Sequence, residues 1–144
     1  MTEFGVSFTE EDKFQGESLG ASPQFDALEE KVRFSLKHCS TDKNWCIKNV
    51  SKERQLLRKL YERLGHIEQM TWKQIQSVDR KKGISKEKKD SNNHKELRKD
   101  NAQFTEFGHM RVNTPQKSTF RIFGAISDGL FYILRFDVDG KMNH

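Results

Sequence analysis

Two apolar runs rich in β-forming residues flank an Asp-Gly pair near the C-terminus, and this pattern restricts the fold more than any other feature. The runs cover 120–126 and 130–137, and Ser127, Asp128 and Gly129 separate them. An Asp-Gly pair favours the positive φ angles that a tight hairpin turn requires. The sequence therefore predicts an antiparallel β-hairpin in this part of the chain.

Alternation along the first run places a charge in the middle of the predicted sheet. Side chains at successive strand positions point to opposite faces, so Phe120, Ile122 and Gly124 are expected on one face. Arg121 then shares the other face with Phe123. A guanidinium among large apolar side chains requires an anion or a carboxylate as its partner. Arg121 is therefore the strongest candidate for a functional residue.

Two helices are expected upstream of the hairpin. Leucines at helical spacing follow Ser51, a residue type suited to the N-cap, and the pattern ends at Gly65. Thr71 and Gln74 match a capping box, which predicts the start of a second and shorter helix.

Alternating residues predict two further strands, at 31–38 and 109–113. In the first of them, Val32, Phe34 and Leu36 are expected on one face. Residues 79–103 contain only three apolar residues in 25 positions. Three apolar side chains are too few to sustain a packed element. We therefore predict that this segment is a long, mobile basic loop with at most one helical turn.

The resulting order is strand, helix, helix, loop and three strands. It predicts an α+β fold in which two helices pack on one face of a small, mainly antiparallel sheet and leave the other face available for binding. Leu, Ile, Val and Phe make up about 24% of the chain, which suffices for a single core. We expect one domain over 30–144, preceded at 1–29 by an acidic arm that is a loop or partly disordered.

Charge is distributed unevenly along the chain. Residues 1–30 hold one basic and eight acidic residues, whereas residues 47–100 hold sixteen basic and eight acidic residues. A cationic surface attracts polyanions, and nucleic acid is the expected partner. The alternative, that the charges only solvate a helix and a loop, stays open. The acidic arm is either a tail or a cover for the basic surface.

Several classes of protein are excluded by what the sequence lacks. No run of 18 apolar residues and no secretory signal are present, so we expect a cytoplasmic protein without a membrane partner. Cys39 and Cys46 should therefore stay reduced. Histidines and cysteines do not recur at the spacings of zinc sites, and no phosphate-binding loop occurs. Neither a metal nor a cofactor is expected.

Basic residues and imidazoles near the predicted sheet remain as candidates for chemistry. RNA can be cleaved without metal when one group removes the 2′-hydroxyl proton, cations hold the charge on the phosphate and an acid protonates the departing 5′-oxygen. Histidine suits the proton steps and arginine suits the phosphate. The predicted catalytic residues are His109, Arg111, Arg121 and His144, and the predicted RNA contacts are Arg80, Lys81, Lys82 and Arg135.

These candidates also have structural alternatives that the sequence leaves open. His109 suits a packed strand residue, His144 suits a frayed chain end, and Arg135 suits an ion pair across the hairpin. Asp137 is expected either to orient Arg121 or to cap the end of its strand.

Two segments of the chain resemble known sequences. The segment MTWKQIQ at 70–76 and the hairpin FRIFGAISDGLFYILRFD at 120–137 are similar to uncharacterised RelE-like proteins of bacterial and prophage genomes. Together with the expected order of elements, they resemble the RelE/ParE-like toxin superfamily, whose order is β, α, α, β, β, β. That resemblance covers roughly residues 30 to 144.

The resemblance implies a function. RelE-type members cut messenger RNA on the ribosome without metal, and some complete the active site with a C-terminal His or Tyr, a role that would fall here to His144 beside Arg121. It implies an endoribonuclease toxin of a toxin–antitoxin module, with RNA, the ribosome and a cognate antitoxin protein as partners. The competing hypothesis is a non-catalytic module on the same fold that binds nucleic acid or an antitoxin.

Overall fold

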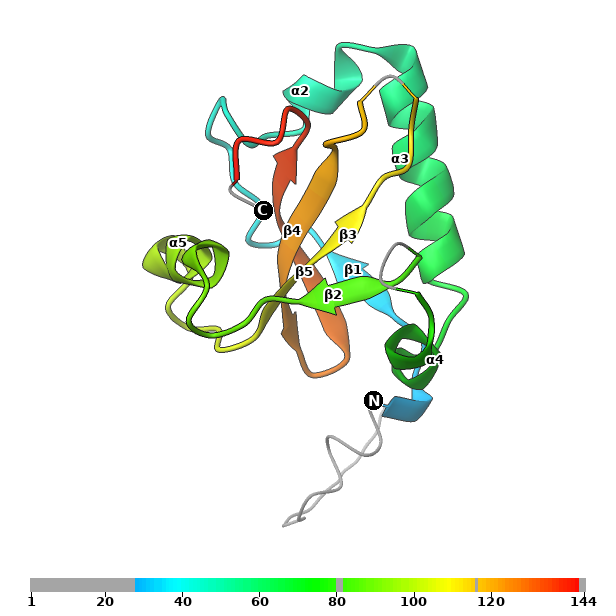
Figure 1. The fold of residues 1–144 in the computed structure, drawn as a ribbon, viewed down its shortest axis with the longest axis vertical. Helices are drawn as coiled ribbons and strands as arrows, with labels where there is room; N and C mark the ends of the chain where they lie inside the picture. Colours follow the sequence, from blue (N-terminus) through cyan, green and yellow to red (C-terminus); the bar gives the residue numbers. More distant parts are fainter. Residues whose placement is uncertain (1–27, 80–81, 116, 143–144) are drawn as a thin grey trace.

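The computed structural model describes residues 28–79, 82–115 and 117–142. The acidic arm expected at 1–29 lies almost entirely outside this part of the chain. The described residues form one sheet of five strands in the order β1-β5-β4-β3-β2 (Figure 1). The strands are β1 (Arg33–Ser35), β2 (Ile84–Lys86), β3 (Phe107–Arg111), β4 (Arg121–Ser127) and β5 (Leu130–Asp137).

The predicted hairpin is confirmed as β4 and β5. Its turn has φ angles of 52° at Asp128 and 80° at Gly129, the sign that a two-residue hairpin turn demands. β1 pairs with β5 in parallel, and the other three pairings are antiparallel. The predicted α+β class is confirmed, with a mixed sheet in which antiparallel pairs dominate.

One face of the sheet is covered by helices that precede β2. They are α2 (Lys48–Ser51), α3 (Arg54–Ile67) and α4 (Trp72–Ser77), and Figure 1 shows α3 and α4 on the same side of the sheet. Leu56, Leu60 and Ile67 of α3 are buried against residues such as Ile122 of β4. This packing forms the larger of the two apolar clusters.

The expected ends of the first long helix were wrong. Ser51 ends α2, and Glu53 is the N-cap residue of α3. The helix continues through Gly65, because one more turn buries Ile67 completely. The capping box of α4 is confirmed, since the Thr71 hydroxyl accepts from the Gln74 amide at 3.1 Å and the Gln74 side chain accepts from the Thr71 amide at 2.9 Å.

The first strand is shorter than the 31–38 that alternation predicts. Leu36 was expected on the buried face, but it is 65% exposed. The chain turns directly after β1, where the Lys37 amide donates to the Ser35 hydroxyl and the Cys39 amide donates to the Leu36 carbonyl. Those local bonds end the pairing with β5.

The prediction of a mobile loop over 79–103 was wrong. This segment contains the edge strand β2 and the helix α5 (Asn92–Asp100), which lies on the opposite side of the sheet from α3 (Figure 1). Leu97 is fully buried and packs with Phe107, Phe123 and Leu134 in a second apolar cluster. One well-placed leucine and an apolar sheet face are enough to anchor the helix. The face of the sheet opposite α3, which we call the second face, is therefore only partly uncovered.

A β-bulge in the hairpin changes which face the last residues of β5 occupy. Phe123 pairs with Arg135 and Gly124 pairs with Ile133, so Leu134 is the extra residue. Both Leu134 and Arg135 consequently face the second cluster. Within the described residues, no helix combines the length and the apolar character needed to cross a membrane.

Candidate active site

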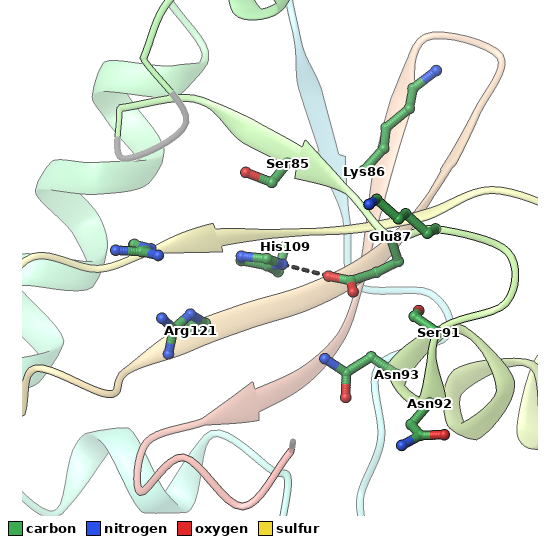
Figure 2. Close-up of a pocket in the computed structure, with 10 residues that line it drawn as sticks. Ser85, Lys86, Glu87, Ser91, Asn92, Asn93, His109 and Arg121 are labelled. Atoms are coloured by element: carbon green, nitrogen blue, oxygen red, sulfur yellow. Dashed lines mark hydrogen bonds and ion pairs between the residues drawn. The ribbon is translucent and has the colours of Figure 1, made fainter. Parts of the chain in front are cut away.

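A groove of about 640 Å³ occupies the part of the second face that α5 leaves uncovered. Strands β2, β3 and β4 form its floor, and the first turn of α5 forms one wall (Figure 2). We call it the His109 groove. It is lined by Ser85, Lys86, Glu87, Lys88, Ser91, Asn92, Asn93, His109, Arg111 and Arg121.

Strand geometry explains why three predicted catalytic residues meet in this groove. His109 and Arg111 are two positions apart on β3, so both point to the same face. On β4, Arg121 lies directly opposite Arg111, and Phe123 lies directly opposite His109. The predicted cluster of His109, Arg111 and Arg121 is therefore present in the structure.

Glu87 and Phe123 both contact the His109 ring. Its Nδ1 atom is hydrogen-bonded to the Glu87 carboxylate, drawn as a dashed line in Figure 2. The ring also packs on Phe123 at 5.3 Å between centroids. Because a carboxylate accepts hydrogen bonds, Nδ1 is the donor in this contact. An imidazole oriented in this way is suited to proton transfer.

Glu87 is fixed in turn by the end of the edge strand. It follows β2 directly, and its amide donates to the Phe107 carbonyl at 2.8 Å. The side chain is 8% exposed and that of His109 is 14% exposed. A buried carboxylate–imidazole pair of this kind fixes the ring orientation and its tautomer.

Arg121 lacks a full set of hydrogen-bond partners. Its Nε is buried and has no hydrogen-bond acceptor among the described residues. Burial lowers the pKa of Arg121, and the neighbouring charge of Arg111 lowers it further, while Asp137 and Glu87 oppose this shift. An anion bound in the groove would offset both the burial and the repulsion.

The backbone on either side of the arginine pair is held firmly. Buried Arg63 of α3 donates from Nε to the Arg111 carbonyl at 2.9 Å, and burial lowers the pKa of Arg63. At the other side, Asp137 lies opposite Arg121 and accepts from the amides of Lys141 and Met142, each at 2.8 Å. Asp137 therefore takes the expected role of a cap at the strand end, and its charge also acts on Arg121, beside which it was expected to lie.

Polar groups from α5 complete the groove. Figure 2 shows Asn93, which is mostly buried, with its amide directed into the groove. Ser91 caps α5, since its hydroxyl accepts from the His94 amide at 3.2 Å. Lys86 extends away from the floor in Figure 2 and pairs with Glu106 at 3.6 Å.

The two predicted RNA contacts that the structure describes, Lys82 and Arg135, do not line this groove. Arg135 has a side chain only 5% exposed, and its guanidinium lies between Trp45, Glu96 and Asp100. Lys82 is exposed but does not line the groove. The remaining predicted site residues, Arg80, Lys81 and His144, lie outside the described residues.

Sequence reasoning missed Glu87 and Asn93 because both fall in the segment expected to be a loop. A signal was available for the helix. Ser91 suits an N-cap, and the residues at 94, 97 and 101 recur at helical spacing. No comparable signal marks Glu87, whose role depends on pairing between β2 and β3.

Chemically, the groove offers a proton acceptor beside two cations. The Nε2 atom of His109 can take a proton, and Arg111 and Arg121 can hold an anion next to it. Among the described residues, no three His, Cys, Asp or Glu side chains cluster closely enough to hold a metal ion. Comparisons of the chain with known protein families, with curated proteins and with solved structures give no match.

Proposed function

We propose that this protein is a metal-independent endoribonuclease that binds a phosphodiester of RNA in the His109 groove. The observation that carries the proposal is that the His109–Glu87 pair and the cations Arg111 and Arg121 line one groove. Histidine is suited to proton transfer near neutral pH, and the planar guanidinium is suited to two phosphate oxygens. The groove thus unites a group suited to proton transfer with two cations suited to the phosphate.

The reaction follows from the positions of these groups. His109 Nε2 takes the proton of a 2′-hydroxyl, and the 2′-oxygen attacks the adjacent phosphorus. Arg111 and Arg121 stabilise the negative charge that builds on the phosphate oxygens. The bond from phosphorus to the 5′-oxygen breaks, and that oxygen takes a proton from water or from a second acid. The products are a 2′,3′-cyclic phosphate and a 5′-hydroxyl end.

The order of elements supports a relationship to the RelE-like fold. Without β2 and α5, the named elements of the described residues are one strand, three helices and three strands, which differs from the expected order only by the short helix α2. On this basis we extend the proposal to a toxin of a toxin–antitoxin module. Its RNA substrate, its ribosome contact and its antitoxin partner rest on the sequence resemblance.

One observation favours a second function. Among the described residues that line the groove, His109 is the single imidazole, and Glu87, the one carboxylate, is already paired with it. A groove without a second acid could bind a nucleic acid and leave it intact. The alternative is therefore a binding module on the same fold.

Cleavage of a single-stranded RNA in the presence of EDTA separates these functions. The wild-type protein should produce 2′,3′-cyclic phosphate ends, and induced expression should arrest growth and shorten transcripts. His109→Ala should lower the cleavage rate about 100-fold or more, since general base catalysis contributes that much. The matched control is His66→Ala, because His66 is exposed on α3, on the other face of the sheet.

A protein that neither cuts RNA nor slows growth would refute the nuclease proposal. Binding of RNA without cleavage, lost in Arg121→Ala, would establish the alternative. Glu87→Gln tests the positioning of His109. It should lower kcat at least about tenfold and leave KM near the wild-type value, because Glu87 orients the base and the arginines hold the phosphate.

A further inference from the structure

A second groove lies on α5 beside the His109 groove. It has a volume of about 520 Å³, and we call it the α5 groove. Four of its lining residues are Lys or Arg, and no Asp or Glu is among the described residues that line it. The lining residues are Lys89, His94, Lys95, Arg98, Lys99, Ala102 and Thr105.

The two grooves lie on either side of the same stretch of chain. Lys88 and Asn93 line the His109 groove, and the next residue in each case, Lys89 or His94, lines the α5 groove. Neighbouring Cα atoms are about 3.8 Å apart. A chain molecule that leaves the first groove over the first turn of α5 therefore has only a short distance to cross before it reaches the second.

Acidic residues of α5 are directed elsewhere. The carboxylates of Glu96 and Asp100 lie 3.4 Å and 3.5 Å from the guanidinium of buried Arg135. Their charges therefore compensate Arg135 on the flank of α5 that faces β5. Lys99 also pairs with Glu96 at 3.6 Å, but Lys99 is 73% exposed, so this pair is weak. The groove keeps a net positive charge.

Among the described residues that line the α5 groove, His94 has the one ring, and that ring is not exposed for a base to stack on. His94 is mostly buried, packs edge-on against Phe107 at 4.9 Å and has its Nε2 3.2 Å from the Thr105 carbonyl oxygen. That ring is part of the core beneath the groove. Lysine and arginine side chains above it suit phosphate oxygens, which carry no base identity.

We propose that the α5 groove is a second RNA-binding site, which holds the phosphates of the strand that leaves the His109 groove. The inference rests on the proposed function, and it adds that the substrate is a single strand of several nucleotides gripped on one side of the cleaved bond. Contact through phosphates makes this grip independent of base sequence and dependent on salt.

A triple substitution in α5 tests the proposal. Lys95→Gln, Arg98→Gln and Lys99→Gln together remove three exposed charges, and glutamine preserves helix propensity. The probes are 2′-O-methyl RNAs, which cannot be cleaved because the attacking hydroxyl is blocked. One probe is a dinucleotide with a single phosphodiester, and the others are strands of about 12 nucleotides with two different base compositions.

The triple variant should bind both long strands at least about tenfold more weakly than the wild type and should bind the dinucleotide equally well. The slope of log affinity against log salt should fall by about 0.7 for each phosphate that the variant no longer binds. The matched control is Lys48→Gln, Arg54→Gln and Lys73→Gln. It removes three exposed charges from α2, α3 and α4, which cover the other face, and should leave all affinities unchanged.

Three results would contradict the proposal, and they are distinguishable. If the triple variant binds the long strands as tightly and with the same salt slope as the wild type, the α5 groove is no RNA site, although an Arg121-dependent affinity for the dinucleotide would still support the proposed function. If the wild type binds none of the probes, both proposals fail. The triple substitution should weaken the binding of both long strands by the same factor. If the two factors differ tenfold, the groove does not contact phosphates alone.

Discussion

Arg111 and Arg121 lie directly opposite each other on the neighbouring strands β3 and β4. Like charges at opposed positions of a sheet destabilise the pairing. The pKa of Arg121 is lowered by burial and by the charge of Arg111, which shows the same repulsion. Retaining such a pair is costly for the fold, and an anion between the two guanidinium groups would offset that cost.

Arg121→Met should therefore change the free energy of unfolding by no more than about 1 kcal/mol, because the lost repulsion from Arg111 is offset by the lost attraction to Asp137 and Glu87. Asp137 keeps its two amide donors from Lys141 and Met142 in the variant. The check is urea unfolding at increasing sulfate concentration. Sulfate should raise the free energy of unfolding of the wild type through binding, and raise that of the variant less.

Arg54→Met serves as the control for this measurement, because Arg54 is exposed at the start of α3. Its response to sulfate should equal that of the wild type. An equal sulfate response in Arg121→Met would show that the arginine pair binds no anion.

Local rules explain what the sequence predicted correctly. The Asp128-Gly129 turn and the capping box of Thr71 depend on neighbouring residues, and both are found where expected. The shared face of His109, Arg111 and Arg121 follows from the period of two in strands that pair antiparallel. These features need no knowledge of distant contacts.

Distant contacts explain what the sequence did not predict. Helix α5 has a single buried leucine, and its stability depends on the sheet face opposite Leu97. The burial of Arg135 depends on the bulge at Leu134, because strict alternation from Ile133 would turn Arg135 to the other face. Glu87 reaches His109 only because β2 pairs with β3. The part of the floor formed by β3 and β4 was thus predictable, whereas β2 and the wall formed by α5 were not.

Leu97→Ala tests whether α5 is anchored as the structure indicates. Leu97 is fully buried among Phe107, Phe123 and Leu134, so its truncation leaves a cavity. Removal of a buried leucine typically costs about 2–5 kcal/mol of stability. Amide hydrogen exchange should accelerate most in α5. Wild-type α5 amides that exchange as fast as an unfolded segment would contradict the packing.

Arg135→Ala tests the buried cation beneath α5. The Arg135 guanidinium lies 4.6 Å from the Trp45 ring centroid and donates to the Met142 sulfur at 3.1 Å, in addition to its two carboxylate partners on α5. Its removal should cost about 2–3 kcal/mol, near the lower range for breaking a buried pair, because the remaining carboxylates are partly exposed. Urea unfolding measures this change.

The effect of Arg135→Ala on RNA binding shows whether Arg135 contacts RNA directly. We expect dinucleotide affinity to stay within about twofold of the wild type, since Arg135 does not line the His109 groove. A large drop in dinucleotide affinity in a variant with an intact sheet would restore the sequence-based expectation that Arg135 binds RNA.

The thiol of Cys39 supplies a test of the loop that joins β1 to α2. Burial raises the pKa of Cys39, and the nearby thiol of Cys46 raises it further, against the opposing effect of a backbone hydrogen bond from Ser40. Only the thiolate reacts with an alkylating reagent, so at about pH 8 Cys39 should react more slowly than an ordinary thiol. Cys46→Ser should make Cys39 react faster, because the effect of Cys46 that raises the pKa of Cys39 is removed.

The same shift fixes the sign of a pH effect on stability. A thiol whose pKa is higher in the folded state holds its proton more tightly there, so its contribution to stability is present below the unfolded pKa and is lost as the pH rises through the folded value. Unfolding measured from neutral to alkaline pH should show a smaller decline in Cys39→Ser than in the wild type. Identical declines in the two proteins would contradict the burial of Cys39, and unchanged alkylation in Cys46→Ser would contradict the effect of Cys46 on Cys39.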